Sequence, residues 1–127
     1  MSKTYIIAEI GINHNGDMKL AKYLIRSASK SGCDAVKFQK RTIDLVYSKD
    51  ELDKYRESPW GKTNREQKEG LEFNDKEYKE LESYSKQKGL DFIVSCWDLQ
   101  SIDDIESLCD VKYHKVASAL VTNREFL

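Results

Sequence analysis

Short apolar blocks alternate with longer amphipathic stretches along this chain. The apolar blocks are rich in β-branched and aromatic residues, which predicts that each forms a buried strand. They span residues 5–10, 34–38, 91–95 and 113–117. The stretches between them carry apolar residues at helical spacing and begin at capping residues, which predicts helices. These helices span 17–30, 74–88 and 99–108, and a further one begins at 122 or 123.

The pattern breaks down between residues 41 and 73. Polar, turn-prone residues there surround Pro59, the one proline of the sequence. This stretch is predicted to be one long connection without regular periodicity. Two of its arginines, Arg56 and Arg65, leave two alternatives open: they belong to an element that covers a substrate, or they are simply solvated.

Strands that alternate with helices predict a parallel α/β sheet with right-handed crossovers. A complete (β/α)8 barrel takes about 250 residues. Four β/α units in 127 residues make about half of one. A small open sheet also fits this length, so the choice between them depends on the motifs.

Composition narrows the class of protein. The 127 residues suffice for one domain and are too few for two. With 39% apolar and 34% charged residues and a net charge of −1, the chain does not read as a membrane protein or as a nucleic-acid binder. The three cysteines have no CxxC spacing, which argues against a disulfide framework and a zinc site. Without a signal peptide or a membrane span, we expect a cytoplasmic protein.

Polar side chains gather where the predicted strands end, which is the edge at which parallel α/β folds build their sites. They are Glu9, Asn13, His14, Lys37, Gln39, Ser95, Trp97, Asp98, Lys115 and Ser118. Two lysines, two hydroxyls and a carboxylate at one edge indicate an anionic substrate with an acid–base group beside it.

Each of these residues also has a plainer interpretation. A lysine near a strand end is usually a solvated surface group. The two histidines, His14 and His114, fit hydrogen-bonded structural groups better than metal ligands, because no third ligand is spaced with them. Glu9 is harder to dismiss, since a carboxylate within an apolar strand is costly unless it is paired, and such positions are often functional.

Four segments resemble one enzyme family. Residues 8–16 (AEIGINHNG) and 34–39 (DAVKFQ) resemble the opening and second-strand motifs of the sialic acid synthase (N-acetylneuraminate synthase-like) family. Residues 113–118 (YHKVAS) resemble its fourth strand, and 56–68 resemble a loop of many bacterial members. The resemblance implies that residues 1–127 form the N-terminal half of a (β/α)8 TIM barrel, as a single partial domain with about the first four β/α units.

The resemblance also implies an activity. Family members condense phosphoenolpyruvate with an N-acetylated amino-sugar aldehyde, typically N-acetylmannosamine, and release phosphate and a nine-carbon 2-keto acid. By this analogy Glu9 acts in proton transfer or orientation, and Gln39 contacts the acceptor sugar. The residues that would hold phosphoenolpyruvate are Lys37, Ser95, Lys115 and Ser118. For Asn13 and His14 two alternatives stay open: they line the barrel mouth, or they hold the loop and cap the helix.

The family uses a divalent metal, Mn²⁺ or Mg²⁺, whose histidine ligands lie on later strands and are not expected in this chain. Its full-length enzymes are expected to be homodimers. A half-barrel exposes sheet edges and apolar faces, so this chain is expected to dimerise or aggregate, and on its own it is expected to be an incomplete enzyme.

Two departures from the family pattern bear on function. Leu120 stands where some synthases have a sugar-contacting carboxylate, which leaves the acceptor open, and residues 95–97 (SCW) replace the commoner Thr-Pro-Phe. One alternative is another phosphoenolpyruvate-dependent 3-deoxy-sugar-acid synthase. Another is a non-catalytic half-barrel that binds a sugar phosphate or a partner chain.

Overall fold

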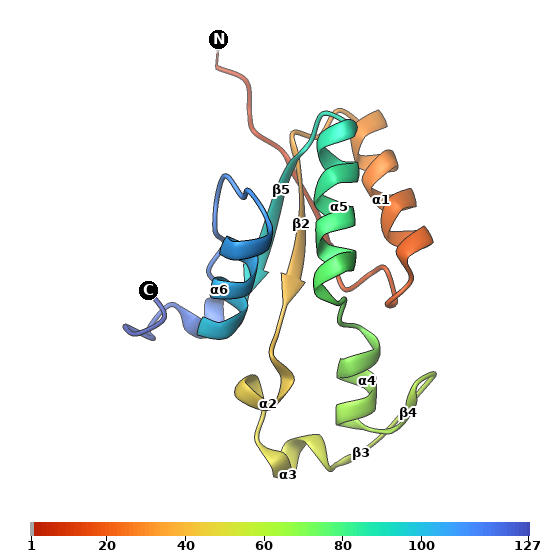
Figure 1. Ribbon diagram of the computed structural model, residues 1–127, viewed down its shortest axis with the longest axis vertical. Helices are drawn as coiled ribbons and strands as arrows, with labels where there is room; N and C mark the ends of the chain where they lie inside the picture. Colours follow the sequence, from red (N-terminus) through yellow and green to blue (C-terminus); the bar gives the residue numbers. More distant parts are fainter. Residues whose placement is uncertain (1) are drawn as a thin grey trace.

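The computed structural model describes residues 2–127 and has a three-stranded parallel sheet at its centre (Figure 1). The strands are β1 (Ile7–Gly11), β2 (Ala35–Lys40) and β5 (Asp91–Cys96). They lie in the order β1–β2–β5, and both neighbouring pairs are parallel. This confirms the predicted α/β class and three of the four predicted strands, with ends that differ by one or two residues.

Three helices pack on one face of the sheet: α1 (Met18–Lys30), α5 (Asp75–Gln87) and α6 (Leu99–Leu108). Figure 1 shows α1 and α5 side by side along the strands. Asp17, Asn74 and Asp98 cap them by accepting hydrogen bonds from backbone N–H groups of the first turn. Asp17 and Asn74 are the capping residues from which the sequence predicted α1 and α5, whereas α6 was predicted from its apolar spacing alone.

The alternation of side chains along each strand divides the sheet into two faces. Even-numbered residues of β2 and β5 point at the helices and form the core with apolar residues from α1, α5 and α6. These strand residues are Val36, Phe38, Phe92, Val94 and Cys96. The opposite face is left to odd-numbered residues, and it carries most of the predicted site.

The connection between β2 and α5 contains regular elements, contrary to the prediction for residues 41–73. They are α2 (Ile43–Val46), α3 (Lys49–Leu52), β3 (Tyr55–Ser58), β4 (Gly61–Thr63) and α4 (Asn64–Gly70). Figure 1 places them beyond the carboxyl ends of the strands. Local capping specifies these short elements, since Ser48 caps α3 and Thr63 forms a capping box with Glu66 in α4. Such short elements leave no trace in hydrophobic periodicity.

The prediction of a fourth strand at residues 113–117 is wrong. Residues 113–117 make one isolated parallel bridge, between Val94 and His114. Strand pairing stabilises a segment most when both of its edges are bonded, and in the described chain this segment pairs with β5 alone. The 3-10 helix η1 (Ser118–Leu120) and turns follow, in place of the helix predicted from 122 or 123. Four β/α units and a closed barrel therefore stay predictions.

No helix between residues 2 and 127 has the combination of length and apolar character that crossing a bilayer requires. The three cysteines, Cys33, Cys96 and Cys109, are all free thiols.

Candidate functional site

Glu9 and Lys37 form an ion pair on the sheet face opposite the helices. They are register partners in β1 and β2, and Lys37 Nζ lies 2.6 Å from Glu9 Oε2. The Lys37 side chain is 9% exposed, whereas that of Glu9 is 57% exposed. The sequence suggested a carboxylate buried in an apolar strand, but the structure leaves the Glu9 side chain largely exposed. It neutralises a buried ammonium group and presents its own oxygens to solvent.

Gln39 and Ser95 continue the same face toward the carboxyl ends of the strands. They are register partners in β2 and β5, two residues beyond Lys37 and its partner Ile93. The Ser95 hydroxyl is buried and donates a hydrogen bond to the Lys115 carbonyl at 3.1 Å. The structure therefore brings Glu9, Lys37, Gln39 and Ser95 together on one surface.

Lys115 and Ser118 lie in the segment that follows β5 and α6. The hydrogen bond from Ser95 holds the backbone of Lys115 beside β5, and Ser118 begins η1. Both residues are exposed. Lys115 also lines a cavity of about 300 Å³ between α6 and the C-terminal residues, together with Cys96 and Glu106. The side chains of Lys115 and Ser118 are therefore less constrained on the Glu9–Lys37 surface than the buried side chain of Ser95 is.

His14 lies inside the structure, away from the Glu9–Lys37 surface. Its ring is 1% exposed and stacks near Phe38 and Phe73, with ring centres 5.9 and 4.2 Å away. Its Nδ1 accepts a hydrogen bond from Gly16 N–H at 2.9 Å. Burial lowers the pKa of His14 to about 4, so the ring is neutral at pH 7. These contacts favour the loop-holding alternative for His14, while Asn13 beside it is exposed.

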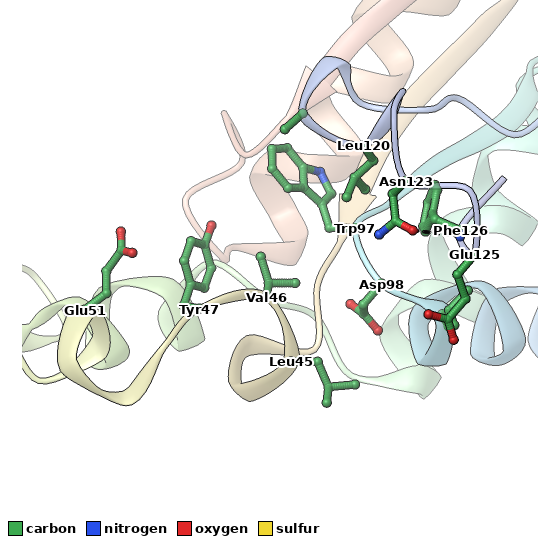
Figure 2. A pocket seen from close by; sticks show the side chains of 12 residues that line it. Leu45, Val46, Tyr47, Glu51, Trp97, Asp98, Leu120, Asn123, Glu125 and Phe126 are labelled. Atoms are coloured by element: carbon green, nitrogen blue, oxygen red, sulfur yellow. Dashed lines mark hydrogen bonds between the residues drawn. The ribbon is translucent and has the colours of Figure 1, made fainter.

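A cavity of about 540 Å³ opens near the carboxyl ends of β2 and β5. Figure 2 shows Val46 and Tyr47 on one side of it and Trp97 and Leu120 on the other. The sequence had pointed to Trp97 and Leu120 separately, but it gave no sign that Tyr47 would join them. Tyr47 follows α2, one of the short elements that periodicity missed.

Asp98 serves the fold of this region. One carboxylate oxygen accepts a hydrogen bond from Thr42 N–H at 2.7 Å, and the other accepts from Ser101 N–H at 2.8 Å. The carboxylate thereby joins the end of β2 to the start of α6. Its oxygens are occupied by backbone donors, so Asp98 shapes the cavity wall.

Comparison with known proteins relates the chain to one family. A model of the NeuB family matches residues 24–127. N-acetylneuraminate-9-phosphate synthase of Mus musculus is 39% identical over 125 residues, which cover 97% of this chain and 34% of that protein. N,N'-diacetyllegionaminic acid synthase of Legionella pneumophila is 39% identical over 126 residues, covering 97% and 35%. The chain thus spans about a third of the length of these curated relatives.

Solved structures agree in fold. N-acetylneuraminic acid synthetase from Leptospira borgpetersenii, in complex with citrate, superposes with a TM-score of 0.79 and 25% identity, over 96% of this chain and 39% of that one. The spore coat polysaccharide biosynthesis protein spsE from Bacillus subtilis superposes with a TM-score of 0.63 and 30% identity, over 92% and 30%. The parallel α/β arrangement seen here is therefore that of sialic acid synthetase structures.

Proposed function

The chain belongs to the NeuB family, and from this membership we propose that it carries part of a site for condensing phosphoenolpyruvate with an N-acetylated amino-sugar aldehyde. Its relatives are synthases of N-acetylneuraminate 9-phosphate, legionaminic acid and pseudaminic acid. The acceptor we propose is N-acetylmannosamine or a similar sugar. The products are then a nine-carbon 2-keto acid and phosphate.

The Glu9–Lys37 pair is the observation that supports this proposal best. Phosphoenolpyruvate carries a carboxylate and a phosphate, so its site needs a cation and hydrogen-bond donors. Lys37 supplies a fixed ammonium group, and the amide of Gln39 lies further along the same strand face. Ser95 adds a hydroxyl on the neighbouring strand, at the level of Gln39. A solvated lysine would need no carboxylate partner at 2.6 Å.

The proposed chemistry gives Glu9 a role. A bond forms between the methylene carbon of phosphoenolpyruvate and the aldehyde carbon, and the aldehyde oxygen takes up a proton to become a hydroxyl. Water then adds to the former enol carbon, loses a proton, and phosphate leaves as the ketone forms. Glu9 is the exposed carboxylate on the Lys37 surface, so we assign it to proton transfer or to orienting the reacting groups.

The family resemblance also implies Mn²⁺ or Mg²⁺, which would polarise the aldehyde as a Lewis acid. Within residues 2–127, no group of three or more His, Cys, Asp or Glu side chains is placed to hold a metal ion. The described residues therefore do not fit the metal.

Leu120 supports a second candidate for the acceptor. It lines the cavity near Trp97, at the position where some synthases carry a sugar-contacting carboxylate. An apolar side chain cannot accept a hydrogen bond from a sugar hydroxyl, so an acceptor other than N-acetylmannosamine fits this wall. A phosphoenolpyruvate-dependent synthase of another 3-deoxy-sugar acid is the resulting alternative, and a screen of aldehyde sugars distinguishes the two.

Isothermal titration of phosphoenolpyruvate into the 127-residue chain tests the proposal. We expect binding that falls about 10-fold or more in Lys37→Gln, because a charge-assisted contact is lost. Lys115→Ala tests whether the exposed Lys115 also contributes to phosphoenolpyruvate affinity. Lys19→Ala is the matched control, because Lys19 is exposed on α1, which packs on the sheet face opposite Lys37. Absence of binding by a chain with a cooperative unfolding transition would contradict the proposal.

A further inference from the structure

Two cationic side chains hold the Tyr47 side chain in place. Arg41 directly follows β2, and its Nη1 donates a hydrogen bond to the Tyr47 hydroxyl at 2.8 Å. Its guanidinium carbon lies 5.7 Å from the centre of the Tyr47 ring. Lys68, on α4, has its Nζ 4.5 Å from the same ring centre. Cations are attracted to the face of an aromatic ring, so these contacts fix both the ring and its hydroxyl.

Arg41 is itself fixed by a buried carboxylate. Glu72 Oε1 lies 2.9 Å from Arg41 Nε, and the two side chains are 14% and 6% exposed. Glu72 Oε2 also accepts a hydrogen bond from the Arg41 backbone N–H at 3.3 Å. Arg41 begins the long connection and Glu72 lies near its end, so this ion pair closes the connection at its base. The guanidinium that contacts Tyr47 is therefore a rigid donor.

The Tyr47 hydroxyl keeps a proton to donate. A phenol oxygen accepts hydrogen bonds through its lone pairs and donates its single proton. Because Arg41 donates to this oxygen, the hydroxyl proton points away from the guanidinium. No atom of residues 2–127 accepts that proton. Tyr47 is half-exposed and lines the 540 Å³ cavity, so a molecule in the cavity can supply the missing acceptor.

The cavity wall next to Tyr47 is apolar. Figure 2 shows Val46 beside Tyr47, and Trp97 and Leu120 across the cavity, while Glu51 lies on the other side of Tyr47 from Val46. A sugar hydroxyl bound here would need an acceptor for its own proton, which Val46 and Leu120 cannot provide. An amide carbonyl only accepts hydrogen bonds. The carbonyl oxygen and methyl of an N-acyl group therefore match this part of the wall.

We propose that Tyr47 determines specificity for the acceptor by donating a hydrogen bond to the oxygen of its N-acyl group, with Arg41 as the positioning residue. This inference rests on the proposed condensation, because it places the acceptor in the cavity. The acyl methyl packs against the apolar wall formed by Val46 and Leu120. Because the Arg41 contact holds the hydroxyl before the sugar arrives, little conformational freedom is lost on binding.

Isothermal titration with N-acetylmannosamine and with mannose, which lacks the acyl group, tests the contact. We expect the chain to bind N-acetylmannosamine about 10-fold more tightly, and Tyr47→Phe to remove most of that preference, because one hydrogen bond is lost. Tyr55→Phe should keep the preference, since Tyr55 is an exposed tyrosine of β3 outside the cavity wall. Both sugars are titrated into the same sample, so partial unfolding of a variant affects them alike and leaves the affinity ratio readable.

Arg41→Lys tests the positioning role. Lysine keeps a positive charge beside Glu72 but lacks the planar fork that reaches Glu72 and Tyr47 together. The variant should lower the ratio of the two sugar affinities, and adding it to Tyr47→Phe should change the ratio little, because both substitutions break one contact. A purely structural role for Arg41 would weaken both sugars by the same factor and leave the ratio unchanged.

An unchanged affinity ratio in Tyr47→Phe would overturn the inference. Equal affinity of the wild-type chain for the two sugars, or no binding of either, would also overturn it. Phosphoenolpyruvate binding separates this result from the proposed function, because it should depend on Lys37 and be unchanged in Tyr47→Phe. A chain that binds phosphoenolpyruvate through Lys37 but keeps its sugar preference in Tyr47→Phe refutes the role of Tyr47 alone.

Discussion

The ring of His14 lies 4.2 Å, centre to centre, from the ring of Phe73. His14 belongs to the loop after β1, whereas Phe73 ends the long connection that precedes α5. This contact joins two segments that are far apart in the sequence. It also holds the loop that carries Asn13 against the end of the long connection.

Burial lowers the pKa of His14 to about 4. The imidazole therefore takes up a proton near pH 6.5 in the unfolded chain, but only near pH 4 in the folded chain. Stability from His14 is therefore complete above about pH 6.5 and is lost as the pH falls toward 4. Between pH 7 and 4.5 we expect this residue to account for roughly 2–3 kcal/mol of lost unfolding free energy. Urea unfolding should show a flatter pH dependence in His14→Gln than in the wild type. A wild-type slope in His14→Gln would contradict this assignment.

Gly16 is predicted to tolerate no side chain. Its φ is +72°, and a Cβ there would lie 2.1 Å from the carbonyl oxygen of Gly70. Gly32 has a similar φ of +82° with nothing within 4 Å of a Cβ, so it is the matched control. Gly32→Ala should cost about 1–2 kcal/mol from backbone strain alone. Gly16→Ala should cost about 1–3 kcal/mol more because the backbone of α4 must move. Equal costs in urea unfolding would contradict the close contact.

The helices on the sheet were predictable because their signals are local. Asp17 and Asn74 begin α1 and α5, as their side-chain chemistry predicts. The elements of residues 41–73 were not predictable, since their stability comes from contacts across the chain. Gly70, for example, lies so close to the Trp60 ring that a Cβ would approach it to 2.2 Å, and no sequence period reports such a contact.

The candidate site also has a part that the sequence predicts and a part that depends on contacts across the chain. Glu9 and Lys37 could be placed at one edge, because parallel strands direct their carboxyl ends to the same side. Their direct pairing needed the register of β1 and β2. Tyr47 was missed, because it follows α2, one of the short elements that hydrophobic periodicity does not report.

Tyr78 is predicted to hold the end of β2 against α5. Its buried hydroxyl donates a hydrogen bond to the Gln39 carbonyl at 2.8 Å. Tyr78→Phe should lower the unfolding free energy by about 1–2 kcal/mol, because that buried carbonyl loses a donor. Tyr84→Phe is the control, since the Tyr84 hydroxyl makes no side-chain hydrogen bond within residues 2–127. It should change stability by less than about 0.5 kcal/mol. Similar effects for the two variants in urea unfolding would refute the role of Tyr78.

Thiol labelling should distinguish the three cysteines. Burial raises the pKa of Cys96 to about 12 and that of Cys109 to about 11, so at pH 8 neither is appreciably a thiolate. Cys33 is half-exposed. A disulfide reagent should therefore modify one thiol quickly in the folded chain and three in urea. Cys33→Ser should abolish the fast phase, and a fast phase that survives this change would show that the core is open.

Glu9→Gln tests the proposed chemistry most directly. The amide keeps the shape of the side chain and an oxygen near Lys37, but it cannot take up or release a proton. If Glu9 transfers a proton, turnover should fall by about 10²–10⁴ while phosphoenolpyruvate affinity changes little. The assay is phosphate release from phosphoenolpyruvate and N-acetylmannosamine, in a chimera where this chain replaces the matching segment of the Legionella pneumophila synthase.

The matched control for that assay is Glu57→Gln, an exposed glutamate of β3 with no ion pair in the described chain. It should leave turnover unchanged. Loss of affinity together with turnover in Glu9→Gln would instead assign Glu9 to holding Lys37 in place, since the ammonium group would then lose the carboxylate that lies 2.6 Å from it. Turnover near that of the parent chimera would remove Glu9 from the reaction altogether and leave Lys37 as the centre of a binding surface.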